Sequence, residues 1–244
     1  MRARFLAIAL LASTPAFVAC DTAVSPLRLG VAGTVPGVDD TLNVARIRFI
    51  NATAATVFDV AQAGVIATGN GSLRFGASSR CVTVVASSPV LDVRQTGSSV
   101  TVPGFNLTLQ GAGHYTIIAF TDVTGATQFV TLFNSFVPVS GQAGFTVFNA
   151  VSTGIAYDVY VTAPDVVLTT TTPVAAAVLG GVNSAFAGID AATPQRIRIT
   201  TANATTVVLD LGNVTFVPDQ NTILVIAPPL PGTATPRAFL ATGC

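Results

Sequence analysis

The sequence predicts an all-β fold, built as two tandem antiparallel β-sandwich modules behind an export leader and a short tether. Every acidic residue is Asp and every basic residue is Arg, so the chain lacks Glu and Lys, two of the best surface residues for helices. The remainder is rich in Val, Thr and Phe, whose β-branched or aromatic side chains suit a pleated surface. Related strand patterns also occur twice along the chain, which indicates two copies of one module.

Composition limits the classes of partner. The 244 residues are 50% hydrophobic and 9% charged, with a mean hydropathy of +0.67, which is enough apolar material for one large or two smaller cores. The formal net charge is +0. Because Arg2 and Arg4 lie in the leader, the rest of the chain has a small excess of Asp. This balance argues against a nucleic-acid partner and against a polybasic membrane patch.

The first residues have the features of a secretory signal. Arg2 and Arg4 precede the apolar run 5–12, which is shorter than the roughly 20 residues of a membrane span. The segment Val18-Ala19-Cys20 resembles a bacterial lipobox, in which a cysteine follows small or aliphatic residues. This resemblance implies a signal peptide over 1–19 and acyl chains, such as palmitate, that anchor the chain through Cys20. The alternative is an ordinary secretory signal in which Cys20 is incidental.

These features predict that the protein lies in the bacterial cell envelope, on the extracytoplasmic side of a membrane. Asp21 resembles a retention signal for the inner membrane, but the choice between inner and outer membrane stays open. Export also permits disulfides. Cys81 lies in the apparent strand 80–85 and Cys244 is the last residue. A bridge between them would close a long loop, and the alternative is one buried and one loose thiol.

The chain after the leader divides into a tether and two modules. Residues 20–43 hold Pro, Gly and Asp without a clean period, which is typical of a lipidated tether. The first module is expected over 44–140 and the second over 141–244. Asn51 in the first copy corresponds to Asn149 in the second, an offset of 98 residues. Later offsets grow, as loop insertions would produce.

Strands are expected where polar and apolar residues alternate. Residues 46–49 place two arginines on one face, and in 157–161 Tyr, Val and Val share a face with Asp158 pointing away. Short strands separated by turn signals predict an immunoglobulin-like or transthyretin-like sandwich. The Ala-rich stretch 173–179 is expected to form a helical turn or two.

The repeated pattern resembles a known family. The segments Arg48-Phe49-Ile50-Asn51-Ala52 and Phe58-Asp59-Val60 recur as Val147-Phe148-Asn149-Ala150 and Tyr157-Asp158-Val159-Tyr160, and Tyr115-Thr116-Ile117-Ile118-Ala119 follows in the first copy. They are similar to the motifs of the family catalogued as domain of unknown function 4397. The resemblance covers most of 45–244, although the family's Ser-Pro after Asn-Ala is Thr53-Ala54 here. It implies a secreted or lipid-anchored bacterial protein, often with two modules and without an established activity.

The polar residues of this motif favour structural roles. Asn51 and Asn149 each end an expected strand, where an amide side chain can cap a turn by bonding nearby backbone. Asp59 and Asp158 follow on the next strand, facing outward. We expect their carboxylates to be solvated or paired with an arginine such as Arg48.

Few residues suggest chemistry. His114 is the single histidine, and no Gly-x-Ser-x-Gly elbow supplies a serine for a triad. One histidine, no Glu and two widely separated cysteines disfavour a metal site. The sequence therefore indicates no catalytic residue, no metal and no cofactor.

The expected function is non-catalytic: an interaction, adhesion or scaffolding role for a lipid-anchored envelope protein. Its expected partners are the membrane, through the acyl chains, and an envelope protein or polysaccharide. The alternative is a carbohydrate- or peptidoglycan-binding, or hydrolytic, extracytoplasmic module. The absence of Trp and the presence of only three Tyr count against sugar stacking.

Overall fold

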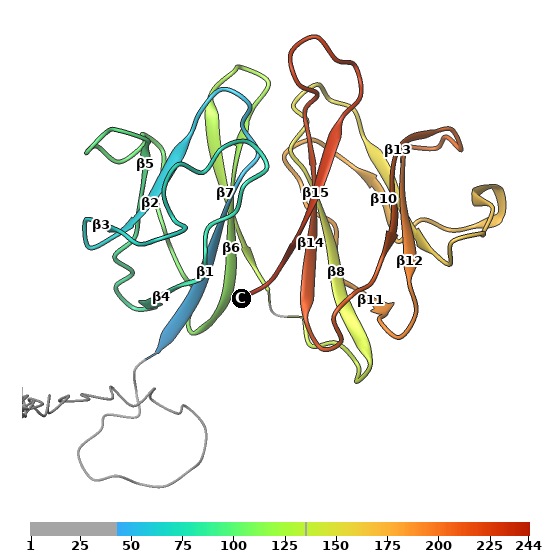
Figure 1. Ribbon diagram of the computed structural model, residues 1–244, viewed down its shortest axis with the longest axis horizontal. Helices are drawn as coiled ribbons and strands as arrows, with labels where there is room; N and C mark the ends of the chain where they lie inside the picture. The colour runs from blue at the N-terminus through green and yellow to red at the C-terminus, as the bar shows by residue number, and fades with distance from the viewer. Residues whose placement is uncertain (1–42, 135) are drawn as a thin grey trace, which may run out of the picture. The chain divides into compact units, whose positions relative to one another are not determined.

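The computed structural model describes residues 43–134 and 136–244, and these residues are almost entirely β-structure (Figure 1). The sole helical element among them is a short 3-10 helix, η1 (Leu168–Thr170). The all-β sandwich fold expected from the sequence is confirmed. No helix in this part of the chain is long and apolar enough to cross a bilayer. The expected signal peptide, with Cys20 and the tether up to residue 42, lies outside the described residues.

The first half of the structure contains two sheets. Its strands are β1 (Val44–Asn51), β2 (Phe58–Gln62), β3 (Val65–Ile66), β4 (Val82–Val85), β5 (Asp92–Gln95), β6 (Gly113–Thr121) and β7 (Thr127–Phe133). One sheet has the order β4-β1-β6-β7 and the other β3-β2-β5. All these pairings are antiparallel except that of β1 with β6, which is parallel.

The second half repeats this arrangement with one more strand. Its strands are β8 (Gln142–Asn149), β9 (Tyr157–Thr162), β10 (Ala175–Val178), β11 (Ala187–Asp190), β12 (Gln195–Thr201), β13 (Val207–Val214), β14 (Asn221–Ala227) and β15 (Arg237–Thr242). The sheets have the orders β11-β8-β14-β15 and β10-β9-β12-β13. The central pair β8–β14 is again parallel, so the internal repeat of the sequence is also a repeat of topology.

Each half has its own hydrophobic core between its two sheets. In the first, the ring of Phe49 lies 5.6 Å from that of Phe58, and Ile117 packs in the same cluster. In the second, Phe145 and Ile199 are fully buried within the equivalent cluster. These residues occupy alternate strand positions, as expected for strands that turn one face to a core.

A third core joins the two halves. Ile50 and Ile118, which point away from the first core, pack in one cluster with Ile223 and Val225 of the second half. Figure 1 shows the sheets that carry these residues, with β6 in one and β14 in the other. The ring of Phe120 lies 5.3 Å from that of Phe148 across this boundary. At these positions the central strands are apolar on both faces, because they lie between two hydrophobic clusters.

The helical turns expected over 173–179 are wrong. Residues Ala175–Val178 form β10, which pairs with β9 in antiparallel register. Ala177 has a φ of +48°, and the register shifts around it, so the strand carries a bulge. Pairing with β9 satisfies the backbone of this stretch and overrides the helix preference of alanine.

Candidate functional site

The two repeated asparagines bind the loops that follow them. The side chain of Asn51 accepts a hydrogen bond from the Thr53 backbone N–H at 2.8 Å, and its amide donates to the carbonyls of Thr56 and Leu73. Asn149 makes the same three kinds of bond, with Val151 N–H and with the carbonyls of Ile155 and Val178. Both side chains are fully buried. The structural role expected for these residues is confirmed.

The two repeated aspartates are also structural, but the expectation of solvated or arginine-paired carboxylates is wrong. Asp59 and Asp158 are only 7% and 6% exposed. Asp59 accepts hydrogen bonds from the Ser72 N–H and the Thr96 hydroxyl, at 2.7 and 2.8 Å. Asp158 accepts them from the N–H groups of Ala177 and Asn203, at 2.6 and 2.9 Å. The strand pattern placed both carboxylates outward correctly, but the loops that cover them could not be read from it.

Arg48, which was expected as a possible partner of these carboxylates, lies at the boundary between the two halves. Its guanidinium donates to the Thr242 carbonyl and to the Cys81 sulfur, 3.5 Å away. Burial lowers the pKa of Arg48. Cys81 and Cys244 are joined in a disulfide, with their Cα atoms 5.7 Å apart. The C-terminal residue of the second half is thus covalently tied to the first half.

His114 is the second residue of strand β6 and is exposed. It lines an open hollow of about 290 Å³ together with Asp219 and Cys244. Within the described part of the chain, no hydrogen bond joins the His114 and Asp219 side chains.

The outer face of strand β12 carries the most distinctive polar group. Ile197 and Ile199 turn inward and are fully buried, so Arg196, Arg198 and Thr200 turn to the opposite face. Across the ladder, the neighbours of these three on β9 are Thr162, Tyr160 and Asp158. The alternation of 195–201 thus places two arginines side by side on one face of the β10-β9-β12-β13 sheet.

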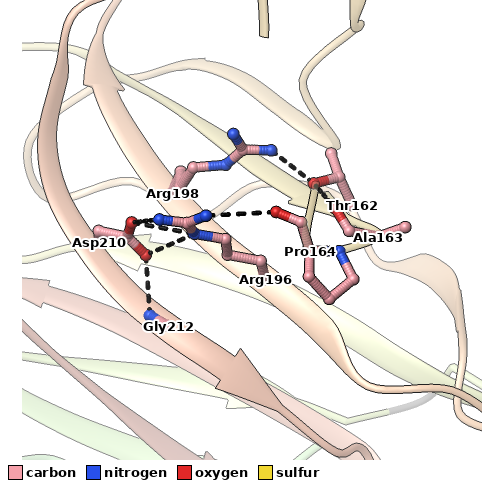
Figure 2. A network of polar contacts seen from close by, with 7 residues as sticks. All are labelled: Thr162, Ala163, Pro164, Arg196, Arg198, Asp210 and Gly212. Carbon is pink, nitrogen blue, oxygen red and sulfur yellow. Dashed lines mark hydrogen bonds and ion pairs between the residues drawn. The ribbon is translucent and has the colours of Figure 1, made fainter. Parts of the chain in front are cut away.

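Arg196 forms an ion pair with Asp210 of β13 (Figure 2). The guanidinium Nε and Nη2 donate to Asp210 Oδ2 at 3.0 and 2.5 Å, and Nη1 donates to the Pro164 carbonyl at 3.2 Å. The hydrogen bond from Arg196 lowers the pKa of Asp210 and in return raises that of Arg196. Both side chains are about one third exposed, so water screens this pair and its contribution to stability is small.

Arg198 differs from Arg196 in its partners. It is 8% exposed, and its Nη2 donates to the Thr162 hydroxyl at 2.6 Å (Figure 2). Its Nε is buried without a hydrogen-bond partner, and no carboxylate of the described residues lies within ion-pair distance of the guanidinium. Asp210 stands opposite Arg198 in the β12–β13 register, but its oxygens bond Arg196 and the Gly212 N–H. A buried cation with so few partners is costly unless something else compensates it.

Both arginines line an open hollow of about 470 Å³ on this face. The segment after β9 and the β12–β13 turn supply its other walls: Pro164, Asp165, Val166, Val167, Leu168, Thr169, Thr205 and Val207. The two guanidinium groups stay protonated and offer only donors, so they can hold an acceptor group. The hollow is suited to binding.

The sequence pattern did not indicate this site as a whole, although it holds one signal for it. In residues 196–199 Arg alternates with Ile, much as Arg alternates with an apolar residue in 46–49, which predicts two outward arginines. No pattern in the sequence indicates that segment 164–169 folds beside these arginines. Comparison with protein-family models and with curated proteins finds no match for this chain.

Proposed function

We propose that this chain is a non-catalytic, lipid-anchored protein of the bacterial cell envelope that acts by binding a partner. The main supporting observation is that most of its carboxylates already accept hydrogen bonds from other groups of the chain. Of the eight Asp in the described residues, six accept hydrogen bonds from groups of this chain, which leaves few free to act as acids or bases: Asp59, Asp92, Asp122, Asp158, Asp190 and Asp210. An anchored body with a donor-lined hollow on its surface is suited to recognition.

Membership of the domain of unknown function 4397 family is also proposed, on the repeated motifs. The matched bonding of Asn51 with Asn149 and of Asp59 with Asp158 supports it, because it gives the repeated residues one physical role in both modules. The carbohydrate-binding alternative has less support. All three tyrosines, Tyr115, Tyr157 and Tyr160, are buried and cannot stack on a sugar ring.

The anchor is tested by the intact mass of the chain purified from bacterial membranes, measured with and without reduction and alkylation. We expect an acylated chain that begins at Cys20 and whose other two cysteines are alkylated only after reduction. An unmodified chain cleaved at another residue would overturn the lipid anchor.

The binding role is tested by photo-cross-linking in intact cells. The chain has no Lys, so amine-reactive reagents are unsuitable, and a photoreactive residue is placed instead at Val167, on the wall of the hollow. We expect a discrete cross-linked species that does not form from a photoreactive residue at Val123, which is exposed on the β6–β7 turn. Identical patterns from both positions would contradict specific binding there.

A further inference from the structure

The structure assigns the hollow beside Arg198 a ligand class: a carboxylate attached to a short, branched apolar body. This inference rests on the proposed binding function and specifies the chemistry of the same site. It is carried by the guanidinium of Arg198, which lines the hollow without an ion-pair partner among the described residues, and by the apolar wall next to it.

The internal repeat shows what is unusual about Arg198. Tyr160, the neighbour of Arg198 on β9, corresponds to Ala61 of the first half by the same offset that relates Asp158 to Asp59. The neighbour of Ala61 is Asp92, so the position of Arg198 holds an acid in the first half. There, Asp92 pairs with Arg94 at 2.9 Å. The first half is therefore neutralised internally on this face, whereas Arg198 shares its opposite acid, Asp210, with Arg196 and does not contact it as an ion pair.

The charges around the hollow, two arginines and two aspartates, sum to zero, but no carboxylate of the described residues is within ion-pair distance of Arg198. Arg196 and Asp210 compensate each other, which leaves Arg198 and Asp165. Asp165 is exposed and is not within ion-pair distance of either guanidinium in the described structure. A ligand carboxylate at Arg198 would accept charge-assisted hydrogen bonds from the terminal N–H groups of the guanidinium that Thr162 does not use.

The apolar wall defines the rest of the ligand. Val166, Val167 and Val207 line the hollow, and Val167 is 65% exposed. These side chains would be covered by a branched aliphatic group attached close to the carboxylate. Both a free branched-chain carboxylate and the C-terminal residue of a peptide ending in Val have this chemistry.

The test is calorimetric titration of the full chain in detergent with matched ligands. The probes are isovalerate, its neutral analogue isovaleramide, an acetylated tripeptide Ala-Ala-Val with a free carboxylate, and the same tripeptide amidated. We expect the acids to bind and the amides to bind at least about tenfold more weakly, because the charge-assisted hydrogen bonds are lost. A tripeptide that binds more tightly than isovalerate identifies a peptide end as the source, and equal affinity identifies a free carboxylate.

Variants test the residues. Arg198→Gln should weaken binding of the acids at least about tenfold, while Arg237→Gln, which removes an exposed charge outside the hollow, should leave it unchanged. Because Arg198 is buried, two exposed positions provide a test without risk to folding. Asp165→Asn should strengthen binding about threefold by removing a like charge, and Val167→Ser should weaken it by a similar factor.

Two results would overturn the inference: equal binding of acids and amides, or unchanged binding by both Arg198→Gln and Asp165→Asn. The outcome is separable from that of the proposed function, because the titration needs neither the cell nor the partner. If a specific cross-link at Val167 persists in cells carrying Arg198→Gln, the proposed binding role stands and the carboxylate ligand class is wrong. If the acids bind in the titration but no cross-link forms in cells, the ligand class stands and the proposed binding role is wrong.

Discussion

Buried amide side chains hold equivalent loops in both halves of the molecule. The Asn149 side chain makes three hydrogen bonds: its oxygen accepts one from the Val151 N–H, and its amide donates two, to the carbonyls of Ile155 and Val178. We expect Asn149→Ala to lower the free energy of unfolding by about 2–4 kcal/mol, because alanine leaves buried backbone groups without partners. Urea denaturation of the full chain measures this loss. Asn213→Ala, at an exposed position, is the control and should change stability by less than about 0.5 kcal/mol; equal losses from both variants would contradict the role of Asn149.

Asp122 makes the stability of the β6–β7 turn depend on pH. Hydrogen bonds from the Thr124 hydroxyl and the Gln128 amide lower its pKa to about 2, from an ordinary value of 3.8. Since the folded pKa is the lower one, the carboxylate stabilises the fold above about pH 4 and loses this effect as the pH falls through 2. The melting temperature of the native chain should exceed that of Asp122→Asn at pH 6, and the gap should close near pH 2. A gap that stays constant over this range would contradict the assignment.

At the scale of single elements, strand β10 depends on a backbone conformation that its sequence does not favour. Ala177 has a φ of +48° and donates its N–H to Asp158 at 2.6 Å. Ser72 has the same kind of conformation, with a φ of +53°, and bonds Asp59 in the first half. The repeated aspartates therefore fix a left-handed residue on the neighbouring segment in both modules.

Removing the Cβ at that position should relieve strain. We expect Ala177→Gly to raise the free energy of unfolding by about 0.5–1 kcal/mol, because glycine adopts positive φ without a steric penalty. Ala176→Gly, one residue earlier in the same strand, should lower it by about 0.5–1 kcal/mol. Thermal unfolding of the two variants gives the comparison. If both lower the melting temperature equally, the bulge is not held by the geometry at Ala177.

Alternation predicted individual strands better than it predicted their surroundings. Residues 46–49 and 157–161 lie in β1 and β9, with the expected faces inward. The same signal could not show that Ile118 and Val225 also become buried, since that depends on contact between the two halves. It likewise could not show that Asp158 and Arg198 are covered on the outer face. The candidate site was missed for this reason: its residues are far apart in sequence and gather only when segment 164–169 folds beside β12.

At the scale of the whole molecule, a covalent link supplements the packing. The Cys81–Cys244 disulfide spans a sequence separation of 163 residues. We expect the double variant Cys81→Ser, Cys244→Ser to lose about 2–5 kcal/mol of unfolding free energy, because the unfolded chain is no longer constrained. Denaturation with and without reductant measures it. Reductant should destabilise the native chain and leave the double variant unchanged, and an effect on both would show that the loss does not come from this bond.

We expect the shared core to give the two halves one unfolding transition rather than two. Ile118 is 0% exposed and packs with Ile223 of the second half, so neither half can open without exposing apolar surface of the other. In hydrogen exchange at increasing urea, the backbone amides of β6 and β14 should therefore lose their protection together in the native chain.

Ile118→Asp places an unpaired charge in this core, so the amides of the two strands should then lose protection separately. Ile118→Ala should keep the two losses together and lower the free energy of unfolding by about 2–5 kcal/mol. Val123→Ala, at an exposed position, should change neither. If the amides of β6 and β14 lose protection separately in the native chain, the two halves unfold independently and do not form one cooperative unit.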